Sequence, residues 1–216
     1  TAIDADYGEA TFKSVQRFQK SRNLDATGEV DRTTWMLLTA PMRKALLPIA
    51  EPLDWTETLL RIARQHVAQN PTERGGPNSG PWVRLYMEGK QGEPQKWCAG
   101  FVCTLAAQAS RDLGIKMPIK RQVGVDALVT DAKKAGLYNS EGDFSDPKLR
   151  PSQVLPGMMF VIRKTATDWN HVGLVTGASE STFNTIEGNT DGENNDGGQA
   201  KSSTRSYGNK DFLRFF

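Results

Sequence analysis

The chain has 216 residues, enough for one sizeable domain or for a medium-sized domain with a small partner. Hydrophobic residues make up 38%, the mean hydropathy is −0.52, and no window approaches the run of about 20 apolar residues that a membrane-spanning helix requires. Lys and Arg number 27 against 25 for Asp and Glu, a balance too slight to indicate a nucleic-acid partner. The composition therefore predicts a soluble globular protein with no membrane span and no nucleic-acid ligand.

Cysteine and histidine are scarce, which narrows the candidates for chemistry. The chain has two residues of each type, namely Cys98, Cys103, His66 and His171. A helix passing through both cysteines would separate their Cα atoms by roughly 7.5 Å along its axis, which is more than a disulfide usually spans. We therefore expect free thiols, and in a protein meant for an oxidising compartment at least one of them is a candidate for reactivity.

Residues 1–40 predict a small helical unit. The first helix is indicated by apolar residues at helical spacing, Phe12, Val15 and Phe18. A second short helix follows, which Asp31 can cap and in which Trp35 and Leu38 are expected to be buried. Two short helices give only a marginal core. We therefore expect this unit to lean on the rest of the protein or to have a further helix before Thr1.

A linker is expected at residues 41–56. Three prolines there stiffen the chain and are expected to break helical continuity, namely Pro41, Pro48 and Pro52. The second and larger domain should then occupy residues 57–216, with a first helix over about 55–68.

The clearest helix begins near Cys98, and strands follow it. Apolar residues keep helical spacing over several turns, at Cys98, Phe101, Val102, Leu105, Ala106 and Ala109. After a further helical stretch at 123–135, the pattern changes to that of strands, which we expect at 158–162, 171–175, 182–187 and 211–216. Helices followed by an antiparallel sheet predict the α+β class.

Cys98 is placed where a helix most favours a reactive thiol. The positive end of the helix dipole and the unpaired N–H groups of the first turn stabilise a thiolate. The same N–H groups can receive the oxyanion of a tetrahedral intermediate. The alternative is that Cys98 is a small buried hydrophobic residue. Cys103 lies in the middle of the same helix without this advantage, and we assign it to packing.

His171 heads a predicted strand, and its neighbours on the next strand decide its role. We expect the two strands to form a hairpin in which Thr176 pairs with Thr182. This register sets His171 opposite Glu187 and leaves Asn189 on the same face. A register slipped by two residues opposes His171 to Asn189 instead. Either neighbour can fix the imidazole tautomer, which completes the arrangement of nucleophile, base and orienting group that acyl transfer requires.

Metal sites are not indicated. His66 lies beside apolar residues of its helix and is expected to be a flank or core histidine. The oxygen-rich run at 189–198 does not fit the calcium-binding spacing of a helix–loop–helix site, and we expect a mobile loop beside the active site. Two histidines and two cysteines so arranged do not make a zinc site. We expect neither a metal nor another cofactor.

Five segments of the C-terminal part, residues 57–216, follow one another in a characteristic order: GGPNSGPWVRLY, QKWCAGFV, LPGMMFVI, NHVGLV and IEGNT. Together they resemble the CHAP family, the cysteine- and histidine-dependent amidohydrolases and peptidases. The resemblance implies a papain-like α+β fold and hydrolysis of peptidoglycan, at the muramoyl–alanine amide or within the stem or cross-bridge peptides. It implies Cys98 as nucleophile, His171 as general base, and Glu187 with Asn189 as the orienting pair. Calcium-binding members carry an acidic loop upstream of the cysteine, which we do not find here.

The segment IDADYGEATFKSVQRFQKSRNLDATGEVDRTTW resembles the three-helix peptidoglycan-binding module and places it at residues 1–40. The first helix of that module would precede Thr1. A binding module ahead of a wall-cleaving domain would raise the effective concentration of an insoluble substrate. The alternative is that this unit is a structural appendage.

These resemblances predict a peptidoglycan hydrolase of the kind found in phage lysins, autolysins or antibacterial effectors. It is expected to act as a monomer on the bacterial cell wall, in the periplasm or outside the cell. One alternative is a cell-wall-binding protein that has lost its chemistry, against which the retained cysteine and histidine argue. Another is an amidase acting on a small thiol or polyamine conjugate, against which the N-terminal module argues.

Overall fold

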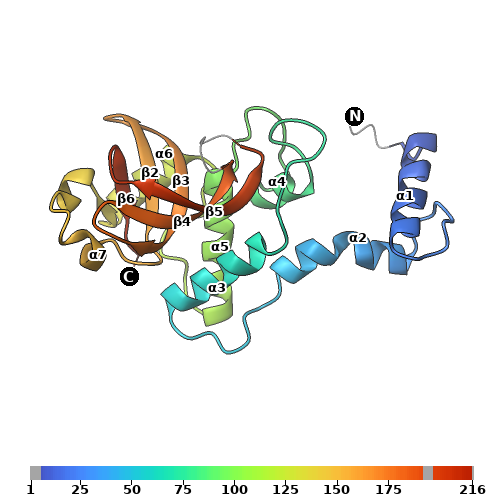
Figure 1. The fold of residues 1–216 in the computed structure, drawn as a ribbon, viewed down its shortest axis with the longest axis horizontal. Coiled ribbons are helices and arrows are strands. Elements are labelled where there is room, and N and C mark those ends of the chain that lie inside the picture. The colour runs from blue at the N-terminus through green and yellow to red at the C-terminus, as the bar shows by residue number, and fades with distance from the viewer. Residues whose placement is uncertain (1–5, 192–196, 216) are drawn as a thin grey trace. The chain divides into compact units, whose positions relative to one another are not determined.

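The computed structural model describes residues 6–191 and 197–215 (Figure 1). The chain divides into two compact units, Thr1–Lys44 and Ala45–Phe216. The helices are α1 (Glu9–Ser21), α2 (Arg32–Ala45), α3 (Trp55–Val67), α4 (Pro81–Tyr86), α5 (Cys98–Leu113), α6 (Val125–Lys134), the 3-10 helix η1 (Glu141–Phe144) and α7 (Arg150–Gln153). The strands are β1 (Tyr138–Asn139), β2 (Met159–Thr165), β3 (Asp168–Ala178), β4 (Thr182–Thr190), β5 (Gln199–Ser206) and β6 (Lys210–Leu213). Among the described residues, no helix combines the length and the apolar character that crossing a bilayer requires.

A buried glutamine organises the first unit. The side-chain amide of Gln19 in α1 donates to the carbonyl of Glu29 at 2.8 Å and to the hydroxyl of Thr34 at 3.1 Å. Its carbonyl oxygen accepts from the N–H of Gly28 at 2.9 Å. Gly28 has a left-handed backbone (φ 79°), and the ring of Phe12 lies so close that a side chain there would clash. Hydrogen bonds from one side chain thus fix the turn between α1 and α2.

The expected burial of Trp35 and Leu38 is wrong. These side chains are 60% and 41% exposed, although their helix forms and Asp31 accepts from the N–H of Thr34 at 2.7 Å, as a capping residue should. Two short helices enclose only a thin layer of side chains. Helical spacing indicated which residues share a face but not whether another element covers that face.

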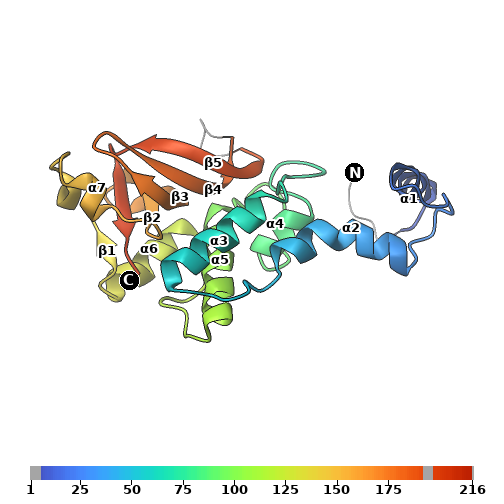
Figure 2. The same cartoon turned by 60° about the horizontal axis from the view of Figure 1, so that its bottom comes forward.

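An antiparallel sheet forms the centre of the second unit, with strand order β1-β6-β2-β3-β4-β5. Helix α5 contacts β3 and β4, α6 contacts β3, and α3 packs on α5. Figure 2 shows these helices together beneath the sheet. The predicted α+β class is confirmed, because the helical segments come first in this unit and pack on an antiparallel sheet formed mainly by the later residues.

Helix α2 continues through Pro41, contrary to the expectation that this proline breaks it. Proline removes one N–H from the helix ladder and crowds the preceding turn, yet the helix continues to Ala45. Ala45 is the last residue of α2, and it belongs with Leu47 to the second unit. Their carbonyl groups accept hydrogen bonds from the side chains of Gln65 in α3, at 2.9 and 2.8 Å, and Gln108 in α5, both at 3.2 Å. Within the second unit, residues 45–47 of the expected linker are therefore bound to its helices.

The hairpin of β3 and β4 has a different register from the one expected. Gly173, rather than His171, pairs with Glu187. Thr176 is an extra residue in β3, a β-bulge between the pairs on either side of it. The turn is also tighter than the five-residue loop expected, since hydrogen bonds close it at 179–182. The observed register is the slipped one of the two alternatives.

Candidate functional site

Helix α5 begins at Cys98, as predicted, and holds this residue at its positive end. A backbone hydrogen bond runs from the N–H of Phe101 to the carbonyl of Trp97 at 2.9 Å, so the N–H groups of Cys98 and Ala99 lie ahead of the helix ladder. Cys98 is 1% exposed, and both cysteines are free thiols, as expected. The partial positive charge of the helix start favours a thiolate at this position.

The end of α4 fixes the start of α5. The ring of Tyr86 stacks on that of Trp97, with 5.3 Å between the centroids. The indole N–H of Trp97 donates to Glu73 at 2.8 Å. Gly100 lies so close to the carbonyl of Tyr86 that a side chain there would clash. The residue before Cys98 is therefore held by aromatic stacking and by a hydrogen bond.

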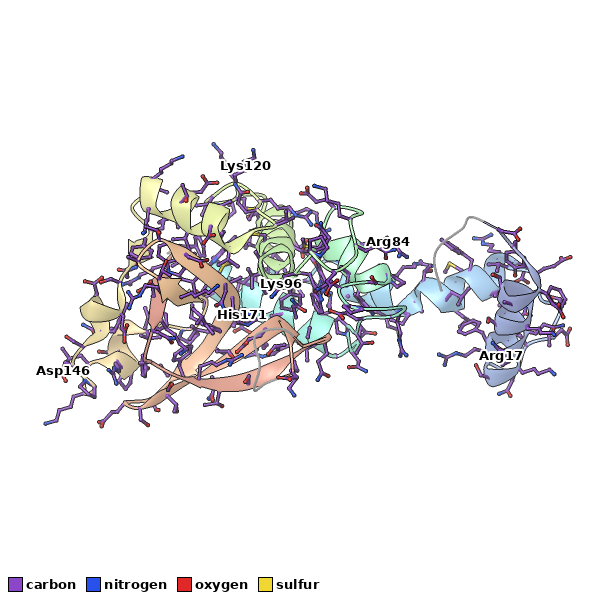
Figure 3. All side chains as sticks on the ribbon, turned by 90° about the horizontal axis from the view of Figure 1, so that it is seen from above. Arg17, Arg84, Lys96, Lys120, Asp146 and His171 are labelled. Atoms are coloured by element: carbon purple, nitrogen blue, oxygen red, sulfur yellow. The ribbon has the colours of Figure 1, made fainter. Side chains whose placement is uncertain are left out.

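His171 on β3 forms a buried pair with Glu187 on β4. Nε2 of the imidazole donates to Oε2 of the carboxylate at 2.7 Å, and both side chains are 0% exposed. Among the described residues, no group meets Nδ1 in a hydrogen bond of standard geometry. The Cys98 thiol interacts with the same ring. Because Nε2 is bound to Glu187, Nδ1 is the ring nitrogen available to the thiol. Figure 3 shows His171 among the strands and Lys96 on the segment that leads into α5.

Gly173 explains how Glu187 reaches His171 in the slipped register. It stands directly opposite Glu187 and two residues along β3 from His171. A Cβ atom on this glycine would lie 2.7 Å from Cγ of Glu187 and 2.6 Å from the ring of Phe160. The missing side chain lets the carboxylate lean along the strand toward the imidazole. The contact depends on this gap in the sheet face and not on direct cross-strand pairing.

Glu187 is held by two further side chains. The hydroxyl of Thr185 donates to Oε1 at 2.6 Å. Arg205 on β5 donates from Nε to Oε1 at 2.8 Å and from Nη2 to Oε2 at 2.6 Å. Two-point pairing of a guanidinium with a carboxylate is among the strongest charged contacts in proteins. Together with the imidazole, these groups give each carboxylate oxygen two donors.

Burial alone would lower the pKa of His171 and raise that of Glu187. At the imidazole, the Cys98 thiol and then the Glu187 carboxylate outweigh burial and raise the pKa to about 9. At the carboxylate, Arg205 and then His171 outweigh burial and lower the pKa to about 2. At neutral pH the imidazole is therefore a cation and the carboxylate an anion, and both side chains are buried.

The second cysteine and the second histidine occupy core positions. Cys103 is fully buried in the middle of α5, and burial raises its pKa to about 11. His66 in α3 is buried between the hydroxyl of Tyr86 at 3.0 Å and the amide oxygen of Gln108 at 3.1 Å. Burial lowers the pKa of His66. The core position expected for His66 is confirmed.

Asn189 lies two residues beyond Glu187 and is fully buried. Its backbone is left-handed (φ 55°), and the ladder between β4 and β5 is interrupted between Glu187 and Thr190. The alternation of faces that placed Asn189 beside His171 therefore does not extend to it. The hydrogen bond found for the imidazole is the one to Glu187. Of the run at 189–198, residues 192–196 lie outside the described part of the chain.

A surface pocket of about 330 Å³ adjoins the segment before Cys98. Its lining is mostly polar and includes both signs of charge, with Glu73, Pro77, Asn78, Glu93, Lys96, Gly197 and Gly198. Such a lining suits a polar ligand better than an apolar one. Within residues 6–191 and 197–215, no three His, Cys, Asp or Glu side chains are grouped so that they could hold a metal ion.

Three residues around the Glu187 carboxylate were not identified from the sequence: Gly173, Thr185 and Arg205. Thr185 had a usable signal, because a spacing of two from Glu187 puts its hydroxyl on the same strand face. Arg205 had none, since the Ser- and Thr-rich segment of β5 does not have the apolar pattern of a buried strand. The importance of Gly173 depends on the register, which the alternation of side chains does not determine.

Comparison with known proteins bears on the first unit. The family model of the peptidoglycan-binding domain matches residues 1–38. The search of the curated proteins finds no relative that matches this chain. The matched residues do not include the site on α5, β3 and β4. It supports peptidoglycan as a partner and a cell-wall context for the chain, whose N-terminal segment is similar to a peptidoglycan-binding domain.

Proposed function

We propose that the second unit hydrolyses an amide bond of peptidoglycan, as a muramoyl–alanine amidase or a peptide endopeptidase, with Cys98 as the nucleophile. The observation that carries the proposal is the buried series of groups that runs from Cys98 at the start of α5 through His171 to Glu187. This series supplies the nucleophile, base and orienting group of acyl transfer. The resemblance to the CHAP family gives the substrate class, and the match of residues 1–38 agrees with it.

The reaction follows from the charges of these groups. In the proposed cycle His171 takes the proton of the Cys98 thiol, and the helix start favours the resulting thiolate. The thiolate attacks the carbonyl carbon of the amide, and N–H groups at the start of α5 stabilise the oxyanion. His171 then gives its proton to the leaving amine as the C–N bond breaks, and the acyl group remains on Cys98 as a thioester. Water, deprotonated by the neutral imidazole, attacks the thioester and releases the carboxylic acid.

Glu187 remains an anion throughout this cycle. It fixes the imidazole ring through Nε2, which leaves Nδ1 for proton exchange with Cys98 and the leaving group. Its charge compensates the imidazolium, which is buried from bulk solvent. Asn189 is the second member of the orienting pair that the resemblance implies.

Digestion of purified peptidoglycan with the full chain tests the proposal. We expect soluble fragments to be released, each cleavage producing one new amino group and one new carboxyl group with the addition of a water molecule. Mass spectra of the fragments distinguish cleavage at the muramoyl–alanine amide from cleavage within the peptides. Sedimentation of the chain with the cell wall without release of any fragment would show a binding protein instead.

Removal of residues 1–44 should separate binding from chemistry. The shortened protein, beginning at Ala45, is expected to cleave soluble muropeptides within about twofold of the full-chain rate, while its affinity for insoluble cell wall falls by about tenfold or more. The reason is that a second binding site increases affinity only for a polymeric substrate, which both units can bind at the same time. Rates on soluble fragments and co-sedimentation with the cell wall measure the two effects separately. Equal sedimentation of both proteins would assign the first unit a structural role.

A further inference from the structure

Arg205 occupies the side of Glu187 that faces away from His171. In the ladder between β4 and β5, Arg205 pairs with Phe183, and Lys201 is the residue directly opposite Glu187. The guanidinium therefore extends along the sheet face to reach both carboxylate oxygens, at 2.6 and 2.8 Å. Its side chain is 10% exposed and that of Glu187 is 0% exposed. Only a long, forked side chain can bind both oxygens of a buried carboxylate from this position on β5.

The fork determines where the carboxylate points. A carboxylate has about four favourable positions for donors, and here Arg205 takes two of them, one on each oxygen. Thr185 takes a third position, on Oε1. The position that remains, on Oε2, receives Nε2 of His171 at 2.7 Å. The orientation of the acid toward the imidazole is thus fixed from the opposite side.

We propose that Arg205 is a positioning residue that aims the Glu187 carboxylate at His171 and keeps it ionised. In this role it acts on the imidazole through Glu187, and its Nη2 also donates to the hydroxyl of Thr190 at 3.4 Å. Without the guanidinium, burial favours the neutral form of the acid, and a neutral or displaced acid no longer supports the imidazolium. The consequence for catalysis rests on the proposed function, whereas the effect on the imidazole does not.

The direction of the change in the pKa of His171 separates this role from a purely electrostatic one. If Arg205 acted only as a nearby positive charge, its removal would make the imidazole easier to protonate and would raise the pKa of His171. If Arg205 holds the acid in place and ionised, its removal deprives the imidazole of an anion and lowers that pKa. The two mechanisms predict opposite signs.

Other charged groups face this network from neighbouring elements. Cys98 on α5 acts on the imidazole. Asp191, just beyond β4, acts on Arg205. Lys210 on β6 is influenced by both Arg205 and Glu187. These groups are unchanged in every variant compared below, so differences between variants report on Arg205.

The experiment is an NMR titration of the two histidines in the full chain, between pH 5 and pH 10.5, for the unaltered protein and for Arg205→Met. Methionine keeps much of the length of arginine without charge or fork. We expect the pKa of His171 to fall by about one unit or more. His66, buried in α3 and bonded to Tyr86 and Gln108, is an internal reference whose titration should not change. An unchanged or raised pKa of His171 would overturn the proposal.

Two further variants guard against a general loss of structure. Arg163→Met removes a comparable guanidinium of β2, which binds Glu141 at 2.6 Å and Asp211 at 3.1 Å, and is expected to leave the pKa of His171 in place. Arg205→Lys keeps the positive charge but cannot hold both carboxylate oxygens, so it should recover only part of the fall in the pKa of His171. A fall in the pKa of His171 in Arg163→Met equal to that in Arg205→Met would overturn the proposal, because the effect would not be specific to Arg205.

Activity measurements on the same proteins distinguish the two proposals. We expect kcat for wall hydrolysis to fall about tenfold in Arg205→Met with little change in KM, since no substrate contact is lost. If the unaltered protein releases no fragments but the pKa of His171 falls in Arg205→Met, the proposed function fails and the positioning role stands. If the unaltered protein hydrolyses the cell wall and the pKa does not fall, the positioning role fails and the proposed function stands.

Discussion

Replacement of Cys98 by alanine should abolish cell-wall hydrolysis, with a loss in kcat/KM of about 10⁴-fold or more. The reason is chemical and not structural. The alanine variant retains the helix start and the N–H groups that precede the α5 ladder, but it has no atom that can form the thioester. Fragment release from purified peptidoglycan measures the loss, and co-sedimentation with the cell wall should remain as in the unaltered protein.

Cys103 provides a matched control for this prediction. It lies on the same helix and is also fully buried, but it sits in the middle of α5, where burial raises its pKa to about 11. Cys103→Ala should retain hydrolysis within about threefold and lose about 1 kcal/mol of unfolding free energy, because only packing is removed. Retained hydrolysis in the Cys98→Ala protein, or equal losses in both variants, would contradict the assignment of Cys98 as nucleophile.

Replacement of Glu187 by glutamine should preserve a hydrogen bond to His171 while removing the negative charge beside it. The alkaline limb of kcat/KM against pH, expected near the His171 pKa of about 9, should move down by about one to two units, because the imidazolium loses its buried anion. The acidic limb should move up, since a thiolate forms less readily beside a weaker cation. At the optimum we expect a loss of about 10- to 100-fold.

The stability of the protein should follow the same charges. The pKa of His171 in the folded protein, about 9, lies above its ordinary value of 6.5. The imidazolium therefore stabilises the fold fully below pH 6.5, and this contribution is lost as the pH rises through 9. The free energy of unfolding, measured with urea, should fall between pH 7 and pH 10. This fall should be smaller in Glu187→Gln than in the unaltered protein.

Glu141 supplies the control for the Glu187 variant, because its carboxylate also binds an arginine of the sheet, Arg163, at 2.6 Å. Glu141→Gln should leave both limbs of the pH profile in place. Asn189→Ala should cost less activity than Glu187→Gln, because the hydrogen bond of His171 runs to Glu187. If Glu187→Gln kept nearly the kcat/KM of the unaltered protein while Asn189→Ala lost most of it, Asn189 and not Glu187 would be the residue that orients His171.

Elements with strong local periodicity could be predicted from the sequence. The helix expected to begin near Cys98 does begin there, because its apolar stripe is a local feature. The β2, β3, β4 and β6 strands were found for the same reason. The polar β5 was missed, and with it Arg205, since its pattern lacks the apolar alternation of a half-buried strand.

The sequence by itself determined which chemistry-bearing groups this protein has: two thiols too far apart along a helix to pair, one of them at the helix start, and a histidine on a strand, although β3 begins at Asp168 and not at His171 as expected. Only the tertiary structure decided which partners these groups meet. The tight turn at 179–182 and the bulge at Thr176 together set a register two residues from the expected one, and the gap at Gly173 then lets Glu187 reach His171. Side-chain alternation repeats every two residues and is satisfied equally by registers two residues apart. The choice between them therefore came from the turn, the bulge and the packing of distant strands.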